Sequence, residues 1–527
     1  MPKGKTKVQH IKKQKFNNEN CDSDMTFEDC EMAILRHAVE ETETKHGQST
    51  VNSPEIQKML VIVEDFIINK KLVCYGGTAI NNILPKSAQF YNRDLEIPDY
   101  DFYSSNALSD AKELADIYYA AGYKDVEAKA GVHMGTFKVF VNFIPIADIT
   151  HMHKELYDAI SKEAILVAGI RYAPPDFLRM AMYLELSRPA GDVSRWEKVL
   201  KRLTLLNEHY PMAFGKHCDR INFEGKQHET TDVRQKLYIL IRDALISQGA
   251  IFFGGFAMSL YSEAVRSNKK KEGSADFDVI IENPEKCALI LKEHLERENI
   301  KNIKTIKHAA IGELIPEHIE LMVGKHSIAV MYKPIACHNY NKIVRGNSEI
   351  NVASIDTILT FYLSFLYANM DHYNKERLEC MAKFLFEIQQ KNRIEQRGVL
   401  KRFSIECYGK QPTLEDMRAE KAEKYKELKE SKDEKEYEMW FLKYVPDKIQ
   451  HRSSYAKDVS DKNKSVIKDI DEAVDNSEAE PEEPGQIADS TAENITKIIL
   501  KHKQRKSKKR RGTFLDMFRQ RRTRSRR

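Results

Sequence analysis

The stretch "LVCYGGTAINNIL", residues 72–84, decides the fold. The apolar segment "LVCY" predicts a short buried strand, and "TAINNIL" after Gly76 and Gly77 predicts a helix. Two glycines let a ligand approach the backbone closely, and the start of a helix offers free N–H groups that suit a phosphate. Thr78 could add a hydroxyl donor there. By itself, however, a Gly-Gly turn between a strand and a helix is more often only a turn.

Three acidic residues follow this turn in segments that otherwise favour burial. Asp99 and Asp101 lie in "LEIPDYDFYSS" (95–105), and residues two apart on a strand point to one face. Two such carboxylates are costly to bury unpaired, and a divalent cation such as Mg²⁺ removes that cost. Asp148 lies in a third apolar segment, "FIPIADIT". The ordered set predicts a two-metal site for phosphoryl or nucleotidyl transfer, whereas the pair alone would also suit a solvated edge strand.

A basic helix follows the acidic residues. In "SRPAGDVSRWEKVLKRL" (187–203), Arg195, Lys198 and Arg202 have the spacing of one helix face. They could contact a triphosphate or an RNA backbone. The alternative is a solvated basic face with no ligand.

The chain contains an internal repeat. The segment from Ser53, which leads into the Gly-Gly turn, resembles the segment from Thr231, "TDVRQKLYILIRDALISQGAIFFGGFAMSLY". Each predicts an amphipathic helix, a short strand, a Gly-Gly turn and a second helix. Matched landmarks recur in the same order at separations of 172–180 residues: Gly76 with Gly254, Asp99 with Asp276, Asp148 with Glu320, and Asp176 with Asp356. We therefore predict a duplicated unit.

The second copy differs from the first at two landmarks. Phe256 stands where the first copy has Thr78, which removes a hydroxyl, and this alignment matches Glu320 with Asp148. The second copy keeps Asp278, and its acidic residues alone do not exclude a second active site. The differences favour catalysis by the first copy and a structural or RNA-binding role for the second.

Composition restricts the class of protein. The 527 residues, 42% of them hydrophobic, predict two to four domains with a sizeable core. No run of about 18 apolar residues occurs, and the N-terminus lacks the apolar region of a signal peptide, so we expect an intracellular protein without a membrane partner. The eight cysteines show no C-x-x-C pair and no zinc-type spacing, which predicts reduced, mostly buried thiols.

The two ends of the chain are charged. Residues 501–527 hold 14 Lys and Arg residues against one acid, Asp516, whereas the rest of the chain has a small acidic excess. This tail predicts nucleic-acid contact or a nuclear-type address. The acidic segment 459–495 predicts a disordered linker.

The predicted fold class is α+β, with two tandem mixed α/β units, each followed by helices, and disordered charged termini. The expected organisation is a basic arm and lead-in helix, a catalytic domain, a helical segment, a degenerate copy of the catalytic domain, a helical C-terminal region and a disordered tail, at residues 1–50, 51–160, 161–230, 231–350, 351–450 and 451–527.

The ordered set of "GGTAINNIL", "DYD" and a distant aspartate on an apolar strand resembles the signature of the polymerase-β-type nucleotidyltransferase superfamily. With "YLELSRPAGDVSRWEKVLKRL" behind it and a second similar unit following, the chain resembles the poly(A) polymerase catalytic subunit of large cytoplasmic DNA viruses. The likeness is to the mimivirus-like enzymes and, more distantly, to the poxvirus enzyme. It covers about residues 50–450.

The resemblance implies two tandem nucleotidyltransferase-like units and a role for each candidate residue. Asp99 and Asp101 would hold two metal ions, and Asp148 would hold the ion that activates the RNA 3′-hydroxyl for attack on the α-phosphate of ATP. The triphosphate would bind to Gly76, Gly77, Thr78, Arg195 and Lys198. The RNA would contact Arg202 and the tail residues Lys508, Lys509, Arg510 and Arg511.

The resemblance also implies the substrates, cofactor and location: ATP, an RNA 3′ end, Mg²⁺ or Mn²⁺, and the host cytoplasm (viral factory) and virion. Poxvirus relatives gain processivity from a separate subunit, and a homodimer enclosing the RNA is the alternative; no sequence feature decides between them. Nothing in these residues reads the base. A uridylyl- or CCA-adding enzyme and a catalytically silent RNA-binding scaffold therefore remain alternatives.

Overall fold

The computed structural model describes residues 19–22, 25–92, 95–212, 218, 231–265, 277–368, 370, 372–432 and 434–446. The described residues fall into two compact units. One comprises those up to Ile62 and within Phe90–Pro98, and includes helix α1 (Phe27–Val51). The other comprises Val63–Gln89 and the described residues from Asp99 onward. Helix α2 (Pro54–Lys70) contributes its residues from Val63 to the second unit.

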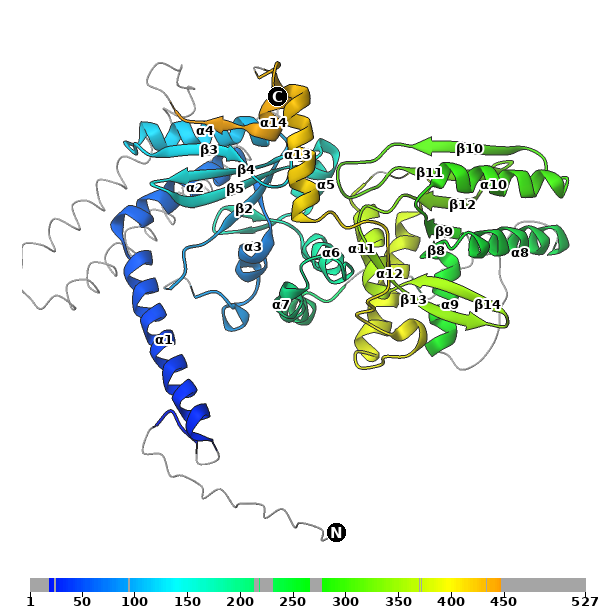
Figure 1. The fold of residues 1–527 in the computed structure, drawn as a ribbon, viewed down its shortest axis with the longest axis horizontal. Helices are drawn as coiled ribbons and strands as arrows, with labels where there is room; N and C mark the ends of the chain where they lie inside the picture. Colours follow the sequence, from blue (N-terminus) through cyan, green and yellow to red (C-terminus); the bar gives the residue numbers. More distant parts are fainter. Residues whose placement is uncertain are drawn as a thin grey trace, which may run out of the picture. The chain divides into compact units, whose positions relative to one another are not determined.

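The second unit contains two mixed β-sheets (Figure 1). The first sheet has, in spatial order, β16 (Lys443–Tyr444), β3 (Val126–Ala130), β4 (Thr136–Val141), β5 (Ile144–His151), β2 (Tyr100–Ser104), β1 (Val73–Cys74), β7 (Ile170–Tyr172) and β6 (Ile165–Val167). The second has β10 (Ile303–His308), β11 (His318–Val323), β12 (His326–Tyr332), β9 (Phe277–Ile280), β8 (Ile251–Phe252), β14 (Ser348–Ala353), β13 (His338–Arg345) and β15 (Cys407–Tyr408).

The two sheets repeat one topology. In each, the short strand before the Gly-Gly turn pairs antiparallel with the strand that carries Asp101 or Asp278. That strand in turn pairs parallel with the second strand of a hairpin. The order β3-β4-β5-β2-β1-β7-β6 therefore corresponds to β10-β11-β12-β9-β8-β14-β13. The predicted α+β fold with two tandem mixed α/β units, one around each sheet, is confirmed. The predicted linker and tail at 451–527, with Lys508, Lys509, Arg510 and Arg511, and most of the predicted N-terminal arm, lie outside the described residues.

Helices cover both sheets. In the first copy, α4 (Ala107–Ala120) packs on β3, β4 and β5, and α3 (Gly76–Ile83) contacts β2. In the second copy, α10 (Pro284–Arg297) packs on β11 and β12. The remaining helices of this unit are α5 (Lys154–Glu163), α6 (Pro175–Leu186), α7 (Trp196–His209), α8 (Thr231–Ser247), α9 (Gly255–Val265), α11 (Ile355–Phe365), α12 (Lys375–Lys391), α13 (Leu414–Leu428) and α14 (Lys435–Phe441).

Strand β2 shows how the sequence buries one face and leaves the other for chemistry. Tyr100 and Phe102 are buried, and Tyr100 donates a hydrogen bond to Glu64 at 2.6 Å. Burying a side chain such as Phe102 contributes about 1.5–3 kcal/mol, which fixes the register of the strand. Asp101, between them, therefore points to the opposite face.

The charged segment 411–440 forms α13 and most of α14, and the chain then returns to the first sheet. Strand β16 pairs antiparallel with β3, and α14 also contacts β3. Polar contacts anchor this return: Glu438 pairs with Lys112 at 2.6 Å, and Tyr444 donates to Asp116 at 2.7 Å. This return is not predictable from the sequence, because a two-residue strand leaves no periodic signal.

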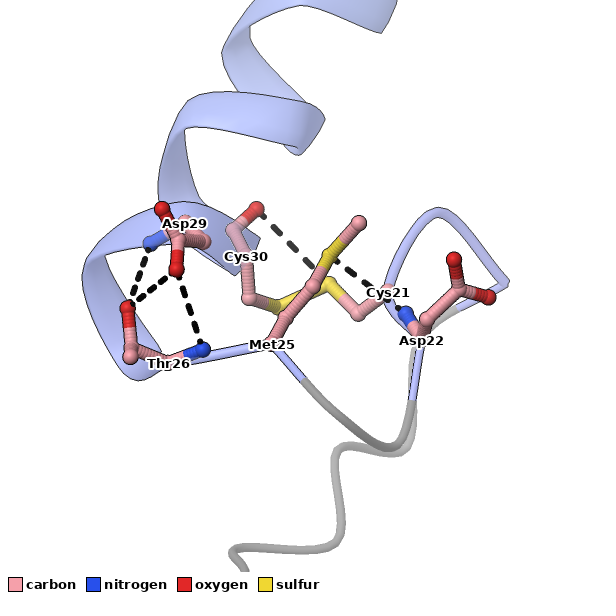
Figure 2. The surroundings of a disulfide bond; sticks show 6 residues. All are labelled: Cys21, Asp22, Met25, Thr26, Asp29 and Cys30. Atoms are coloured by element: carbon pink, nitrogen blue, oxygen red, sulfur yellow. Dashed lines mark hydrogen bonds between the residues drawn. A yellow bond between two sulfur atoms is a disulfide. The ribbon is translucent and has the colours of Figure 1, made fainter.

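The prediction of reduced thiols is wrong for six of the eight cysteines. Three disulfides form, Cys21–Cys30, Cys218–Cys380 and Cys337–Cys407, with Cα–Cα distances of 5.1, 5.3 and 5.2 Å. Figure 2 shows the first of them beside the N-cap of α1, where Thr26 and Asp29 exchange hydrogen bonds. Two of these pairs join residues 70 and 162 positions apart, which spacing rules cannot detect.

We expect thiol counting to reflect this pairing. Protein denatured without reductant in the presence of an alkylating agent should show two modified cysteines, Cys74 and Cys287, because these two form no disulfide and become accessible on unfolding. Peptide mass spectrometry after alkylation provides the measurement. Modification of all eight cysteines would contradict the pairing.

Among the described residues, no helix combines the length and the apolar character needed to cross a membrane.

Candidate functional site

The Gly-Gly turn is the structural centre of the site. Helix α3 begins at Gly76, whose φ of +72° is a left-handed conformation that favours glycine. A Cβ at this position would lie 2.6 Å from Asp101 Oδ2, so the carboxylate packs directly against the glycine backbone. Thr78 Oγ1 donates to the carbonyl of Asp99 at 2.7 Å. The predicted phosphate donor Thr78 thus holds the strand that carries the acidic pair.

The sheet register brings the predicted acidic residues together. Asp101 on β2 lies opposite Asp148 on the parallel neighbour β5. On the other side of Asp148, β4 places Lys138 opposite it, and Lys138 Nζ lies 2.5 Å from Asp148 Oδ2. Facing residues on neighbouring strands share one face of a sheet, so these three side chains form a row. Sequence reasoning missed Lys138.

The electrostatics of the site are those of crowded carboxylates. Burial, together with the negative charges of Asp99 and Asp148, raises the pKa of Asp101 to about 7. Burial and Asp148 also raise the pKa of Asp99. Lys138 opposes both shifts. Two acids whose pKa is raised by neighbouring carboxylates indicate that the site favours additional positive charge.

The donor set fits a hard divalent cation. Asp99, Asp101 and Asp148 supply only carboxylate oxygens, which Mg²⁺ and Mn²⁺ prefer. The absence of a Cβ at Gly76 lets Asp101 Oδ2 lie against the backbone of the turn. In the structure, the ammonium group of Lys138 supplies positive charge beside Asp148. A bound cation would compete with Lys138 for Asp148, and the lysine would then be available to an anionic substrate.

The predicted basic residues lie at the N-cap of α7 (Arg195) and within that helix (Lys198 and Arg202). Arg195 pairs with Glu185 at 3.1 Å and also lowers the pKa of Asp101, which places its charge within electrostatic reach of the acids. Lys198 is exposed on α7. The positive charge of Arg202 opposes the rise in the pKa of Glu185 that burial causes. The structure therefore associates Arg195 with the acidic row more closely than its two helix neighbours.

The sheet register corrects the alignment of the two copies. Glu320 is on β11 and lies opposite Val330, which lies opposite Asp278. The row Lys138–Asp148–Asp101 therefore corresponds to Glu320–Val330–Asp278. The match of Glu320 with Asp148 is wrong: its counterpart in the first copy is Lys138, and the counterpart of Asp148 is Val330.

A shared β-bulge supports this correction. The hairpin of the first sheet shifts register between Val139 and Phe140, and that of the second shifts between Leu321 and Met322. Each bulge lies just before the segment that faces the acidic strand, "IAD" at 146–148 and "IAV" at 328–330. Such bulges re-aim side chains at functional sites. The second copy therefore lacks the third carboxylate.

Other contacts in the second copy occupy the positions that the first leaves for ligands. Phe256, the counterpart of Thr78, is buried and packs on Phe252 and Phe277 with ring centroids 4.8 and 5.8 Å apart. Tyr373 donates a hydrogen bond to Asp278 at 2.6 Å. Asp276 lies outside the described residues. Aromatic packing and a hydrogen-bonded carboxylate are thus present at the positions of Thr78 and Asp101.

We expect metal binding at the first site to depend on pH. Because the pKa of Asp101 is about 7, a proton must leave before this carboxylate binds a cation at lower pH. The Mn²⁺ concentration for half-maximal binding should rise about tenfold per pH unit below 7. Mn²⁺ titrations at several pH values provide the test, and a pH-independent midpoint would contradict it.

The same shift has a consequence for stability. Between pH about 4, the ordinary pKa of an aspartate, and pH about 7, Asp101 is protonated in the folded metal-free chain and ionised in the unfolded chain. The contribution of Asp101 to the free energy of unfolding should therefore fall as the pH rises through this interval.

Sequence comparisons place the site within a known family model. Residues 61–192 match the model described as "Poly(A) polymerase catalytic subunit", which includes all three acids and the Gly-Gly turn. A putative poly(A) polymerase catalytic subunit of African swine fever virus is 35% identical over 167 residues, 31% of this chain and 35% of the relative. That of Acanthamoeba polyphaga mimivirus is 31% identical over 229 residues, 42% of this chain and 38% of the relative. The matches thus span little more than a third of each relative.

The structural comparison extends further along the chain. The crystal structure of the Megavirus polyadenylate synthase superposes with a TM-score of 0.68 at 20% sequence identity, covering 85% of this chain and 92% of that one. At this identity the likeness concerns the fold, which both chains share over most of their length. The chain therefore resembles viral poly(A) polymerase catalytic subunits in the sequence around its acidic site and in its overall fold.

Proposed function

We propose that the protein is a template-independent polynucleotide adenylyltransferase, which adds AMP from ATP to the 3′-hydroxyl of RNA and releases pyrophosphate. The observation that carries this proposal is the row of Asp101 and Asp148 beside the Gly76 turn. Asp99 lies within electrostatic reach of both carboxylates. It lies within the part of the chain that matches viral relatives named for this activity.

Each part of the site has a role in this reaction. The backbone N–H groups at Gly76 and Gly77, at the start of α3, would bind the triphosphate. Asp99, Asp101 and Asp148 would hold two divalent cations, which supply positive charge to the attacking and leaving oxygens. Arg195, balanced by Glu185, would add charge on the triphosphate side.

Positioning supplies the rest. Thr78 holds the backbone of Asp99, and the β2–β5 pairing holds Asp101 against Asp148, so the carboxylates are placed before substrate arrives. By analogy with the viral relatives, the RNA would be a viral messenger with its 3′ end at this row, in the host cytoplasm and virion. Arg202 and the basic tail would contact the RNA backbone.

Nucleotide-specific primer extension tests the proposal. The purified chain is incubated with a labelled RNA primer, Mg²⁺ or Mn²⁺, and one nucleoside triphosphate at a time. We expect extension with ATP at least about tenfold faster than with any other, a preference worth about 1.4 kcal/mol. Extension with UTP, or with CTP followed by ATP, would instead favour the uridylyl- or CCA-adding alternatives. No extension with any nucleotide would favour the silent scaffold.

A further inference from the structure

The second copy carries a cluster of three histidines that the adenylyltransferase reaction does not use. His308 ends β10, His318 begins β11 opposite it, and His372 lies between α11 and α12. One nitrogen of each imidazole lies within 4.8 Å of the others. Among the described residues, these three histidines are the group of potential metal ligands whose donor atoms all lie this close to one another. These residues are here called the histidine cluster.

The rings are arranged side by side. His308 and His318 stack with centroids 4.7 Å apart and planes 9° from parallel, and His372 lies 4.9 and 5.2 Å from them. Antiparallel pairing sets the first two, since His308 and His318 are direct cross-strand partners. Imidazoles gathered at this distance can bind one ion with little movement of the backbone.

His318 is prepared as a ligand. Its side chain is 2% exposed, and Nδ1 donates to the carbonyl of Pro316 at 3.0 Å. A carbonyl accepts only, so Nδ1 carries the proton and Nε2 carries the lone pair. This Nε2 is buried and has no hydrogen-bond partner. A buried acceptor without a partner is destabilising, and a metal ion would satisfy it.

The charge state of His318 suits this use. Burial is the main cause that lowers its pKa to about 4, and the neighbouring His372 and His308 contribute in the same direction. The ring is therefore neutral at physiological pH, which is the form that binds metals.

Glu320 completes the surroundings. Its Oε2 lies 3.1 Å from His308 Nε2, and the carboxylate side chain is 7% exposed. When Nε2 donates to this carboxylate, Nδ1 of His308 holds the lone pair. A carboxylate behind a metal-binding histidine fixes the ring and increases its basicity. His308 itself is 30% exposed, which gives an ion a route from solvent.

We propose that His308, His318 and His372 form a transition-metal site in the second copy, with Zn²⁺ as the favoured ion and Glu320 as the supporting carboxylate. Three imidazoles are a zinc-type ligand set, whereas Mg²⁺ prefers oxygen donors. The ion would join the β10–β11 hairpin to the connection between α11 and α12. The ion would thus support the fold of the second copy next to Glu320, and not in the row that corresponds to the carboxylates of the first copy.

Metal content and stability test this site on the untagged full-length chain. After incubation with Zn²⁺ and dialysis, we expect about one equivalent per chain by elemental mass spectrometry and a higher melting temperature. His308→Asn and His372→Asn should each weaken Zn²⁺ binding at least about 100-fold in a chelator competition, and Glu320→Gln about 10–100-fold. The matched control is His326→Asn, an exposed histidine on β12, which should bind normally.

Two comparisons keep the test decisive. Asp148→Ala should keep its Zn²⁺, which separates the histidine cluster from the acidic site and from the proposed enzyme activity. Co²⁺ bound to the same chain should give the visible absorption of a nitrogen-ligated ion, and this signal should disappear in His308→Asn. Failure of the wild-type chain to retain Zn²⁺, or unchanged affinity in both His308→Asn and His372→Asn, would overturn the proposal.

Discussion

Replacing Asp148 with alanine is expected to lower ATP-dependent primer extension by about 10²–10³-fold or more, because metal-assisted stabilisation at such a site supplies several kcal/mol. Asp148 is the one carboxylate of the row that the second copy lacks, since Val330 occupies the corresponding position. The substitution removes charge at a position that is partly exposed and close to Lys138, so the sheet should remain folded.

The control for this variant is Asp278→Asn. Asp278 corresponds to Asp101, and Tyr373 donates a hydrogen bond to it that an asparagine oxygen can still accept. We expect this variant to extend RNA at the wild-type rate. Loss of extension in Asp278→Asn with activity retained in Asp148→Ala would reverse the assignment of the two copies. Circular dichroism and thermal melts would show whether each variant is folded.

Gly76→Ala is expected to lower primer extension nearly as much as Asp148→Ala does, but for a different reason. The added Cβ would lie 2.6 Å from Asp101 Oδ2, so either the carboxylate or the start of α3 must move. A displacement of about 1 Å at a reacting centre costs roughly 100-fold in rate. The left-handed φ of +72° adds a backbone penalty of about 1–2 kcal/mol in stability.

Gly249→Ala separates these two effects. Gly249 also has a φ of +72°, but a Cβ there would meet no atom within 4 Å. Both variants should lose similar stability in denaturant titrations, and only Gly76→Ala should lose activity. Equal activity in the two variants at a temperature where both are folded would contradict the close contact between Gly76 and Asp101.

Much of the first site was predictable from local sequence. The Gly-Gly turn, the spacing of Asp99 and Asp101 and the apolar strand around Asp148 each have a direct physical reading, and the structure places them on one sheet. Lys138 was not predictable in the same way. A regular hairpin counted from Val141 and Ile144 would place Lys138 opposite Ala147, and the bulge is what moves it opposite Asp148.

The same bulge explains the error in aligning the copies. Matching Glu320 with Asp148 preserved the chemical type and the approximate spacing, but strand β11 corresponds to β4 rather than to β5. The segments "IAD" and "IAV" carry the correct match in the sequence, and the lost charge at Val330 concealed it. The histidine cluster was equally hidden, because His372 joins it only through the fold of the chain.

The most direct test of the central claim is to locate the bound nucleotide. Photoaffinity labelling with an azido derivative of ATP in the presence of Mg²⁺, followed by peptide mapping, identifies the copy that binds it. We predict label in peptides from the first sheet and α3, within residues 72–151, and competition by unmodified ATP. Label confined to the second copy, within residues 251–353, would contradict the assignment of the nucleotide site to the first copy.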